Sequence, residues 1–117
     1  MIVTFDKDGI SSHPNHMAVH KGVAKVFEDP TYPIDVMTLT TVNIVRKYMG
    51  YADIYLNGFD ELHYISLTPY HSYKSMQSHH SQYVWFRKLF TLFSRYAYCN
   101  SFALYANNPE KYKQKGK

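Results

Sequence analysis

The stretch TFDKDGISSHPNH, residues 4–16, joins an apolar run to the start of a helix, and it decides how the chain folds. The run IVTF, residues 2–5, stops at the turn cluster DKDG, so it predicts a short buried strand that ends in a tight turn. Pro14 fits the first position of a helix, because its missing N–H would have no partner there. His13 is then expected at the helix cap and His16 in the first helical turn.

The helix that begins at Pro14 is expected to extend to about Phe27 and to bury one face. The apolar residues that recur at helical spacing on that face are Val19, Val23, Val26 and Phe27.

Beyond this helix the chain alternates strand and helix signals. Strands are predicted at Val36–Val42, Leu62–Leu67 and Phe102–Tyr105, and helices at Asn43–Met49, Tyr73–Ser78 and Ser81–Tyr98. This alternation is typical of an α/β layered fold with a mostly parallel sheet. Residues 1–106 are assigned to that fold, and residues 107–117 are expected to form a frayed basic tail.

Length and composition narrow the class of protein. The 117 residues suffice for one small domain, and 17% aromatic residues favour a packed core over disorder. The net charge of +4 favours an anionic partner such as a phospholipid surface or nucleic acid, but no RNA-binding or zinc-finger pattern supports nucleic acid. Cys99 is the only cysteine, so no internal disulfide forms, and we expect a buried inert thiol.

Two histidines at the predicted helix start are candidates for chemistry. His13 and His16 are three residues apart, so their imidazoles can face one pocket. A neutral imidazole binds zinc, polarises a carbonyl or relays a proton. The alternative is a surface cap with no chemical role. Two histidines also fall short of a catalytic zinc site, which usually takes three protein ligands.

Carboxylate and guanidinium groups supply further candidates. Asp6 follows the first strand, and ligands of open α/β sheets gather at the carboxyl ends of strands, although turn chemistry alone also explains an aspartate there. Arg87 and Arg95 share one face of the predicted late helix. That helix is too short and too charged to span a bilayer, but it suits a membrane interface with its basic edge on phosphates. The alternative is a packed helix with a solvated stripe.

Three segments resemble one known family. Residues 4–16 resemble a signature of the N-acetylglucosaminyl-phosphatidylinositol de-N-acetylases, which belong to the LmbE-like deacetylase superfamily. The segments LTTVNIVRKY, residues 39–48, and HHSQYVWFRKLFTLFSRYAYCN, residues 79–100, are similar to two further family segments in the same order. Together the matches cover most of residues 2–105.

The resemblance implies a Rossmann-like α/β fold, a zinc ion and hydrolysis of the N-acetyl group of N-acetylglucosaminyl-phosphatidylinositol. In the family this reaction serves glycosylphosphatidylinositol-anchor synthesis at the cytoplasmic face of the endoplasmic reticulum. His16 matches the zinc-binding histidine, and His13 matches the catalytic histidine that polarises the acetyl carbonyl or protonates the leaving amine. Asp6 and Asn15 would line the site, and Arg87 and Arg95 would contact the phosphate or the membrane surface.

The sequence departs from the family pattern in two places. Ser12 stands where the family usually has glycine, so we expect its side chain to crowd the loop or to force a strained backbone there. The family's His-Pro-Asp-Asp motif, which supplies two zinc ligands and the general base, does not occur. We therefore expect the amino-terminal half of the domain to be missing and the zinc ligand set to be incomplete.

Three hypotheses follow from these departures. The first is a truncated de-N-acetylase. The second is a catalytically inactive fragment that acts as a binding or regulatory protein, or that needs a partner chain to supply the missing half. The third, a small basic module for membrane surfaces or nucleic acid, explains none of the three ordered matches.

Overall fold

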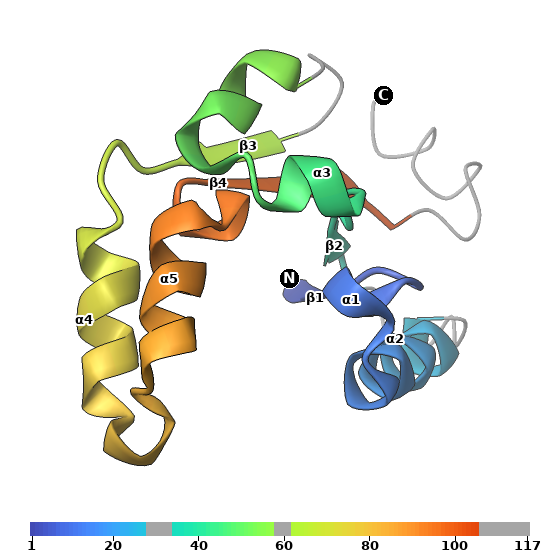
Figure 1. Cartoon of the computed structure of the whole chain (residues 1–117). Coiled ribbons are helices and arrows are strands. Elements are labelled where there is room, and N and C mark those ends of the chain that lie inside the picture. Colours follow the sequence, from blue (N-terminus) through green and yellow to red (C-terminus); the bar gives the residue numbers. More distant parts are fainter. Residues whose placement is uncertain (28–33, 58–61, 106–117) are drawn as a thin grey trace. The chain divides into compact units, whose positions relative to one another are not determined.

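The computed structural model describes residues 1–27, 34–57 and 62–105, and the chain divides into two compact units (Figure 1). Unit 1 comprises Met1–Thr41 and the chain from Phe102 onward, and unit 2 comprises Val42–Ser101. The strands are hydrogen-bonded in the order β1-β2-β4-β3, with β4 (Cys99–Leu104) passing from unit 2 into unit 1. The predicted basic tail lies outside the described residues.

Unit 1 combines β1 (Ile2–Phe5), α1 (Gly9–Ser12), α2 (Pro14–Phe27), β2 (Val36–Leu39) and the end of β4. β1 pairs with β2 in parallel, with Thr4 opposite Thr38, whereas β2 pairs with β4 antiparallel, with Thr38 opposite Ala103. The sheet is therefore mixed, and the prediction of a mostly parallel sheet is wrong. Alternating strands and helices fix the direction only of strands joined by one crossover. In the sequence, residues 40–98 separate β2 from β4, so that rule does not constrain the direction of β4.

The first strand and the first long helix are confirmed at Ile2–Phe5 and Pro14–Phe27, but β1 is only partly buried, because Val3 is 54% exposed. The predicted buried face of α2 is partly wrong, because Val19 and Val26 are 49% and 47% exposed. The inward face instead carries His20 and Phe27, whose rings meet the Tyr105 ring edge-on. Val36 on β2 is only 1% exposed and anchors the core of this unit.

Unit 2 begins with two short helical elements. These are α3 (Ile44–Lys47) and η1 (Gly50–Leu56). Asn43 caps α3 by accepting a hydrogen bond from the Arg46 N–H at 3.0 Å. Gly50, the first residue of η1, has a φ of 55°, which a glycine adopts without strain.

The rest of unit 2 consists of β3 (Leu62–Ile65), α4 (Tyr70–Ser78), η2 (His80–Gln82), α5 (Trp85–Phe93), η3 (Arg95–Ala97) and the start of β4. The single helix predicted at Ser81–Tyr98 is thus three elements. Ser94 takes a ψ of 131° and its side chain accepts a hydrogen bond from the Tyr96 N–H, so α5 ends at Phe93. In the described ranges, no helix combines the length and the apolar character that crossing a bilayer requires.

The interior of unit 2 is unusually polar. Asp53 and Arg95 are both completely buried and form an ion pair at 2.5 Å. Arg46 also pairs with Asp53, at 2.7 Å, from a position that is 28% exposed. Buried ion pairs persist only where further hydrogen bonds satisfy the remaining polar atoms, so these side chains fix how α3, η1 and η3 pack together.

Candidate functional site

The candidate site lies where β1 ends and α2 begins, and Asp6 organises it. One carboxylate oxygen, Oδ1, accepts hydrogen bonds from the backbone N–H groups of Asp8 and Gly9 at 3.1 and 3.0 Å. The Thr41 hydroxyl donates to Oδ1 at 2.6 Å and the Thr41 N–H donates to Oδ2 at 2.5 Å. Both oxygens are thus bound to the loops after β1 and β2. The structure accordingly favours the turn-forming role of Asp6, which supports the site rather than reaching into it.

The turn held by Asp6 has an unusual backbone. Gly9, Ile10 and Ser12 all have positive φ, at 58°, 67° and 54°. A Cβ on Gly9 would lie 2.9 Å from the Cβ of His16, so glycine permits the close approach of turn and helix. The Ile10 N–H donates to the Thr41 hydroxyl at 2.8 Å, which helps to hold this β-branched residue in its strained conformation. The strain expected at Ser12 is confirmed by its φ.

We expect Ser12→Gly to raise the free energy of unfolding by about 0.5–1 kcal/mol. The positive φ costs a non-glycine residue about 1–2 kcal/mol through a Cβ clash, which glycine avoids. Part of this gain is offset because glycine loses more conformational entropy on folding. Urea denaturation measures the change. The matched control is Ser11→Gly, since Ser11 has a φ of −150° and gains nothing from glycine. A Ser12→Gly variant no more stable than the Ser11→Gly variant would contradict this account.

His16 is held in one orientation by two contacts. Its Nδ1 lies 3.0 Å from the Gly9 carbonyl oxygen, and its ring stacks on Phe5 with centroids 4.0 Å apart. A carbonyl oxygen only accepts, so Nδ1 carries the proton and donates it. The Nε2 lone pair of His16 is therefore the free one. A metal-binding histidine is oriented in the same way when its other ring nitrogen donates to a backbone carbonyl.

His13 lies beside His16 in the opposite tautomer. The ring centroids are 4.8 Å apart, so the two imidazoles are neighbours, as their spacing predicted. The Asn15 N–H donates to His13 Nδ1 at 3.3 Å, so neutral His13 carries its proton on Nε2. Its backbone is extended, as expected for a residue that precedes proline. One ring thus offers a lone pair and its neighbour offers an N–H group.

Asn15 and His20 complete this part of α2. Asn15 is exposed in the first turn, where its backbone N–H orients His13. His20 was not predicted to take part in the site, yet its Nδ1 lies 2.9 Å from the Phe5 carbonyl oxygen. His20 follows His16 by four residues, and that spacing was the available signal that both rings share a helix face. His16 and His20 together attach α2 to β1 and the turn. Because this face of α2 points inward, Val19 and Val26 point outward.

The donor groups of the described residues fall short of a complete metal site. Within 1–27, 34–57 and 62–105, no three or more His, Cys, Asp or Glu side chains lie close enough to hold a metal ion together. His16 offers a free Nε2, but the Asp6 oxygens are already bound to their own loops. A catalytic zinc site takes three protein ligands, so these residues do not form one by themselves.

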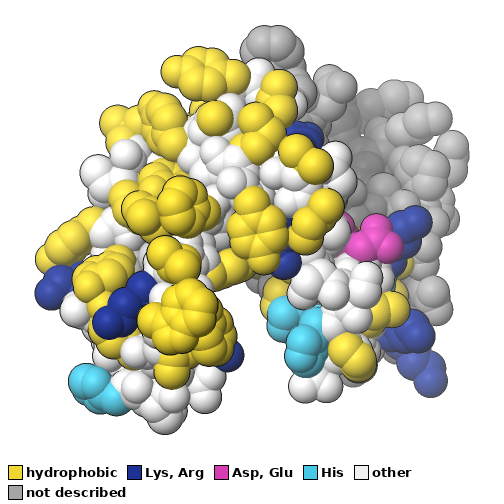
Figure 2. Space-filling view, viewed as in Figure 1, with side chains coloured by type: hydrophobic (Ala, Val, Ile, Leu, Met, Phe, Trp, Pro, Cys, Tyr) yellow, Lys and Arg dark blue, Asp and Glu magenta, His cyan; other side chains and the backbone are white. Residues whose placement is uncertain are grey.

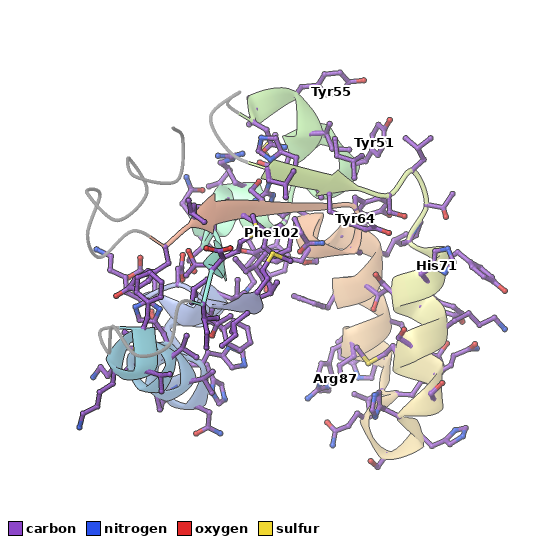
Figure 3. The ribbon with its side chains drawn as sticks, turned by 180° about the vertical axis from the view of Figure 1, so that it is seen from behind. Tyr51, Tyr55, Tyr64, His71, Arg87 and Phe102 are labelled. Carbon is purple, nitrogen blue, oxygen red and sulfur yellow. The ribbon has the colours of Figure 1, made fainter. Side chains whose placement is uncertain are left out.

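The two arginines predicted to contact phosphate or membrane lie in different surroundings. Arg95 is 0% exposed, and its Nη2 donates to Asn57 at 2.7 Å and to Ser101 at 3.0 Å. The proposed contact of Arg95 with phosphate or membrane is therefore wrong, because the end of α5 at Phe93 turns the chain inward. Arg87 is exposed on α5, where Figure 3 labels it, and stays a candidate.

Known proteins were compared with the whole chain. A probable N-acetylglucosaminyl-phosphatidylinositol de-N-acetylase of Dictyostelium discoideum is 35% identical over 136 aligned residues, covering 86% of this chain and 53% of that protein. The de-N-acetylase of Bos taurus is 36% identical over 107 residues, covering 86% of this chain and 42% of its own length. A probable enzyme of the same name from Schizosaccharomyces pombe is 46% identical over 52 residues, 44% of this chain and 21% of that protein.

No family model matches the chain, and no solved structure matches it significantly. The relatives nevertheless agree in name, and two of them match 86% of the chain at 35% and 36% identity. The chain spans about half the length of these curated relatives. On this similarity, the chain belongs to the family of the N-acetylglucosaminyl-phosphatidylinositol de-N-acetylases.

Proposed function

We propose that this chain forms part of an N-acetylglucosaminyl-phosphatidylinositol de-N-acetylase, which hydrolyses the amide bond of the N-acetyl group during glycosylphosphatidylinositol-anchor synthesis. The observation that carries the proposal is the pair of adjacent imidazoles in opposite tautomers, His13 with an N–H at Nε2 and His16 with a lone pair at Nε2. Metal-assisted amide hydrolysis uses both kinds of group, one to bind the metal and one to act on the carbonyl oxygen or the leaving nitrogen.

His13 is the catalytic residue in this proposal. Its Nε2–H can donate a hydrogen bond to the acetyl carbonyl oxygen, which stabilises the negative charge that develops there. A water oxygen adds to the acetyl carbon, and a proton of that water passes to the amide nitrogen as the C–N bond breaks, which leaves glucosaminyl-phosphatidylinositol and acetic acid. Asn15 orients His13, and Asp6 holds the turn on which His16 rests.

His16 supplies one zinc ligand in this proposal. Because the described residues do not complete a zinc site, the other ligands would come from residues outside them, in a Rossmann-like domain of the LmbE-like type. The substrate is a glycolipid, so the enzyme would work at a membrane surface, for which we propose the cytoplasmic face of the endoplasmic reticulum.

The experiment that tests this proposal measures zinc content and glycolipid deacetylation for the chain alone and for the chain co-expressed with the unmatched part of the Dictyostelium discoideum relative. The chain alone is expected to hold no tight zinc and to release no acetate, since the residues that the structure describes contain no group of three ligands. The co-expressed pair is expected to bind zinc and to turn over substrate. A soluble, zinc-loaded pair without turnover would contradict the proposal.

A second candidate is a non-catalytic fragment that acts as a binding or regulatory protein. It is favoured by the absence of a three-ligand group among the residues that the structure covers. The same experiment separates the two candidates, because a purely regulatory fragment would gain neither zinc nor turnover when the remaining part of a relative is supplied.

A further inference from the structure

Helix α5 presents its apolar side to the solvent. Large apolar side chains recur at positions i, i+1, i+4, i+7 and i+8, which is the spacing of one helix face. They are exposed by 72% at Trp85, 53% at Phe86, 46% at Leu89, 51% at Leu92 and 53% at Phe93, and we call these five residues the α5 face. Thr91, on the other side of the helix, is only 4% exposed. In a helix that packs its apolar side onto its own core, this arrangement would be reversed.

The α5 face is continuous with an apolar groove. A cavity of about 500 Å³ is lined by Phe86, Leu89 and Phe93 together with Met76 of α4 and Tyr48. Figure 2 shows hydrophobic side chains gathered over the α4–α5 region with basic side chains among them. Apolar surface of this extent on a soluble unit marks an interaction site.

Charge identifies the partner. Among residues 42–57 and 62–101 the only carboxylate belongs to Asp53, which is buried and paired with two arginines. The groups beside the α5 face are cations. Arg87 and Lys88 lie on α5 itself, and the Lys47 ammonium lies 5.9 Å from the centre of the Phe90 ring. A second copy of this unit would bring like charges together, whereas an anionic surface would meet complementary charge.

We propose that the α5 face docks on an anionic lipid surface, with Trp85, Phe86 and Leu89 among the lipid chains and Arg87 and Lys88 at the headgroups. An aromatic apolar side with basic flanks is the pattern of helices that lie in a membrane interface. This inference rests on the proposed function in one respect, because it names the surface by which unit 2 meets the membrane that holds the substrate. In this proposal the α5 face, Arg87 and Lys88 make the membrane contact that the sequence predicted for Arg95, which is buried.

Trp85 is the only tryptophan of the chain, so its fluorescence reports docking directly. The full chain is mixed with vesicles of phosphatidylcholine that contain about 30 mol% phosphatidylserine, and with phosphatidylcholine vesicles alone. We expect a blue shift of Trp85 emission and at least about tenfold tighter binding to the anionic vesicles, weakened by salt. These vesicles contain no glycolipid substrate, so the result does not depend on hydrolysis.

Three variants sharpen the test. Leu89→Asp removes an inserted side chain and adds a negative charge, so binding is expected to weaken at least about tenfold. The double variant Arg87→Gln/Lys88→Gln is expected to weaken anionic binding about tenfold or more and to remove most of its salt dependence. Tyr55→Asp makes the same charge change as Leu89→Asp on η1, at a side chain that is 81% exposed, and should change binding less than about threefold. Figure 3 places Tyr55 and Arg87 at opposite ends of unit 2.

Three outcomes would overturn the proposal. The first is an unchanged Trp85 spectrum with anionic vesicles. The second is a Leu89→Asp variant that folds by circular dichroism and binds as tightly as the parent chain. The third is a blue shift that grows with protein concentration in the absence of vesicles, which would assign the α5 face to contact between copies of the chain.

Discussion

Replacing Asp53 with alanine is expected to lower the free energy of unfolding by about 3–5 kcal/mol, a large part of the roughly 5–15 kcal/mol that stabilises an ordinary domain. The reason is the charge that the substitution leaves behind. Arg95 is completely buried and Asp53 is its counter-ion, at 2.5 Å. Without the carboxylate, a guanidinium would remain in the interior with no compensating charge, and that loss costs more than the pair itself contributes.

The surroundings of this pair explain why the carboxylate matters more than either arginine. Asp53 faces two guanidiniums, so the cluster carries an excess positive charge. The partly exposed Arg46 donates two hydrogen bonds to the Asp53 carboxylate, at 2.7 and 3.0 Å. The Asn57 side-chain oxygen accepts from both arginines, at 3.0 and 2.7 Å, which disperses the excess. The contact of Arg95 Nε with Asp53 is an ion pair rather than an aligned hydrogen bond, and Arg95 Nη1 has no hydrogen-bond partner among the residues that the structure describes.

Thermal and urea unfolding of the full chain measure the effect. The matched control is Asp8→Ala, which removes an exposed carboxylate and should change stability by no more than about 0.5 kcal/mol. The double variant Asp53→Ala/Arg95→Met should recover part of the loss, because it removes the orphaned charge, while Arg46 can turn to water. A double variant less stable than Asp53→Ala alone would show that Arg95 acts through its other hydrogen bonds and not through its charge.

This cluster also shows where the sequence stops being informative. Asp53 and Arg95 are 42 residues apart, and the sequence around neither residue predicts a contact between them. The sequence pattern predicted Arg95 on a polar helix edge, because helical spacing continues through Ser94 to Tyr98. The helix stops at Phe93 since the Ser94 hydroxyl caps a new turn and the buried ion pair draws Arg95 inward. Tertiary contacts therefore decided both the end of α5 and the side that it exposes.

Local signals were sufficient at the other end of the chain. The turn cluster at residues 6–9 and the proline at position 14 determined the limits of β1 and α2, because both act through backbone geometry within a few residues. The proximity of His13 and His16 also followed from their spacing. Their tautomers did not, since these depend on the Gly9 carbonyl and the Asn15 N–H as the folded turn presents them. The direction of β4 was likewise set by long-range pairing.

His16→Ala is expected to reduce deacetylation by the co-expressed pair more than about 100-fold and to remove zinc from it, if zinc binds through Nε2 as proposed. Loss of an outer partner of a ligand typically costs about 10–100-fold in affinity or activity, and loss of the ligand itself costs more. His13→Ala should also lower turnover, by about 10²–10⁴-fold, yet leave the zinc content unchanged, because His13 acts on the substrate. Zinc content measured beside acetate release thus separates the two roles, which activity alone cannot do.

His20→Gln is the matched control for this pair of variants. His20 is on the same face of α2, four residues beyond His16, but its Nδ1 is used by the Phe5 carbonyl. Glutamine keeps a donor for that carbonyl, so turnover and zinc content should both stay close to those of the parent pair. If His16→Ala retained full zinc and full turnover, the free Nε2 of His16 would have no metal to bind, and the turn braced by Asp6 would serve only to attach α2 to the sheet. If instead His20→Gln lost zinc as well, zinc binding would depend on how α2 packs against β1. Loss of zinc in His16→Ala would then no longer identify the His16 imidazole as a ligand.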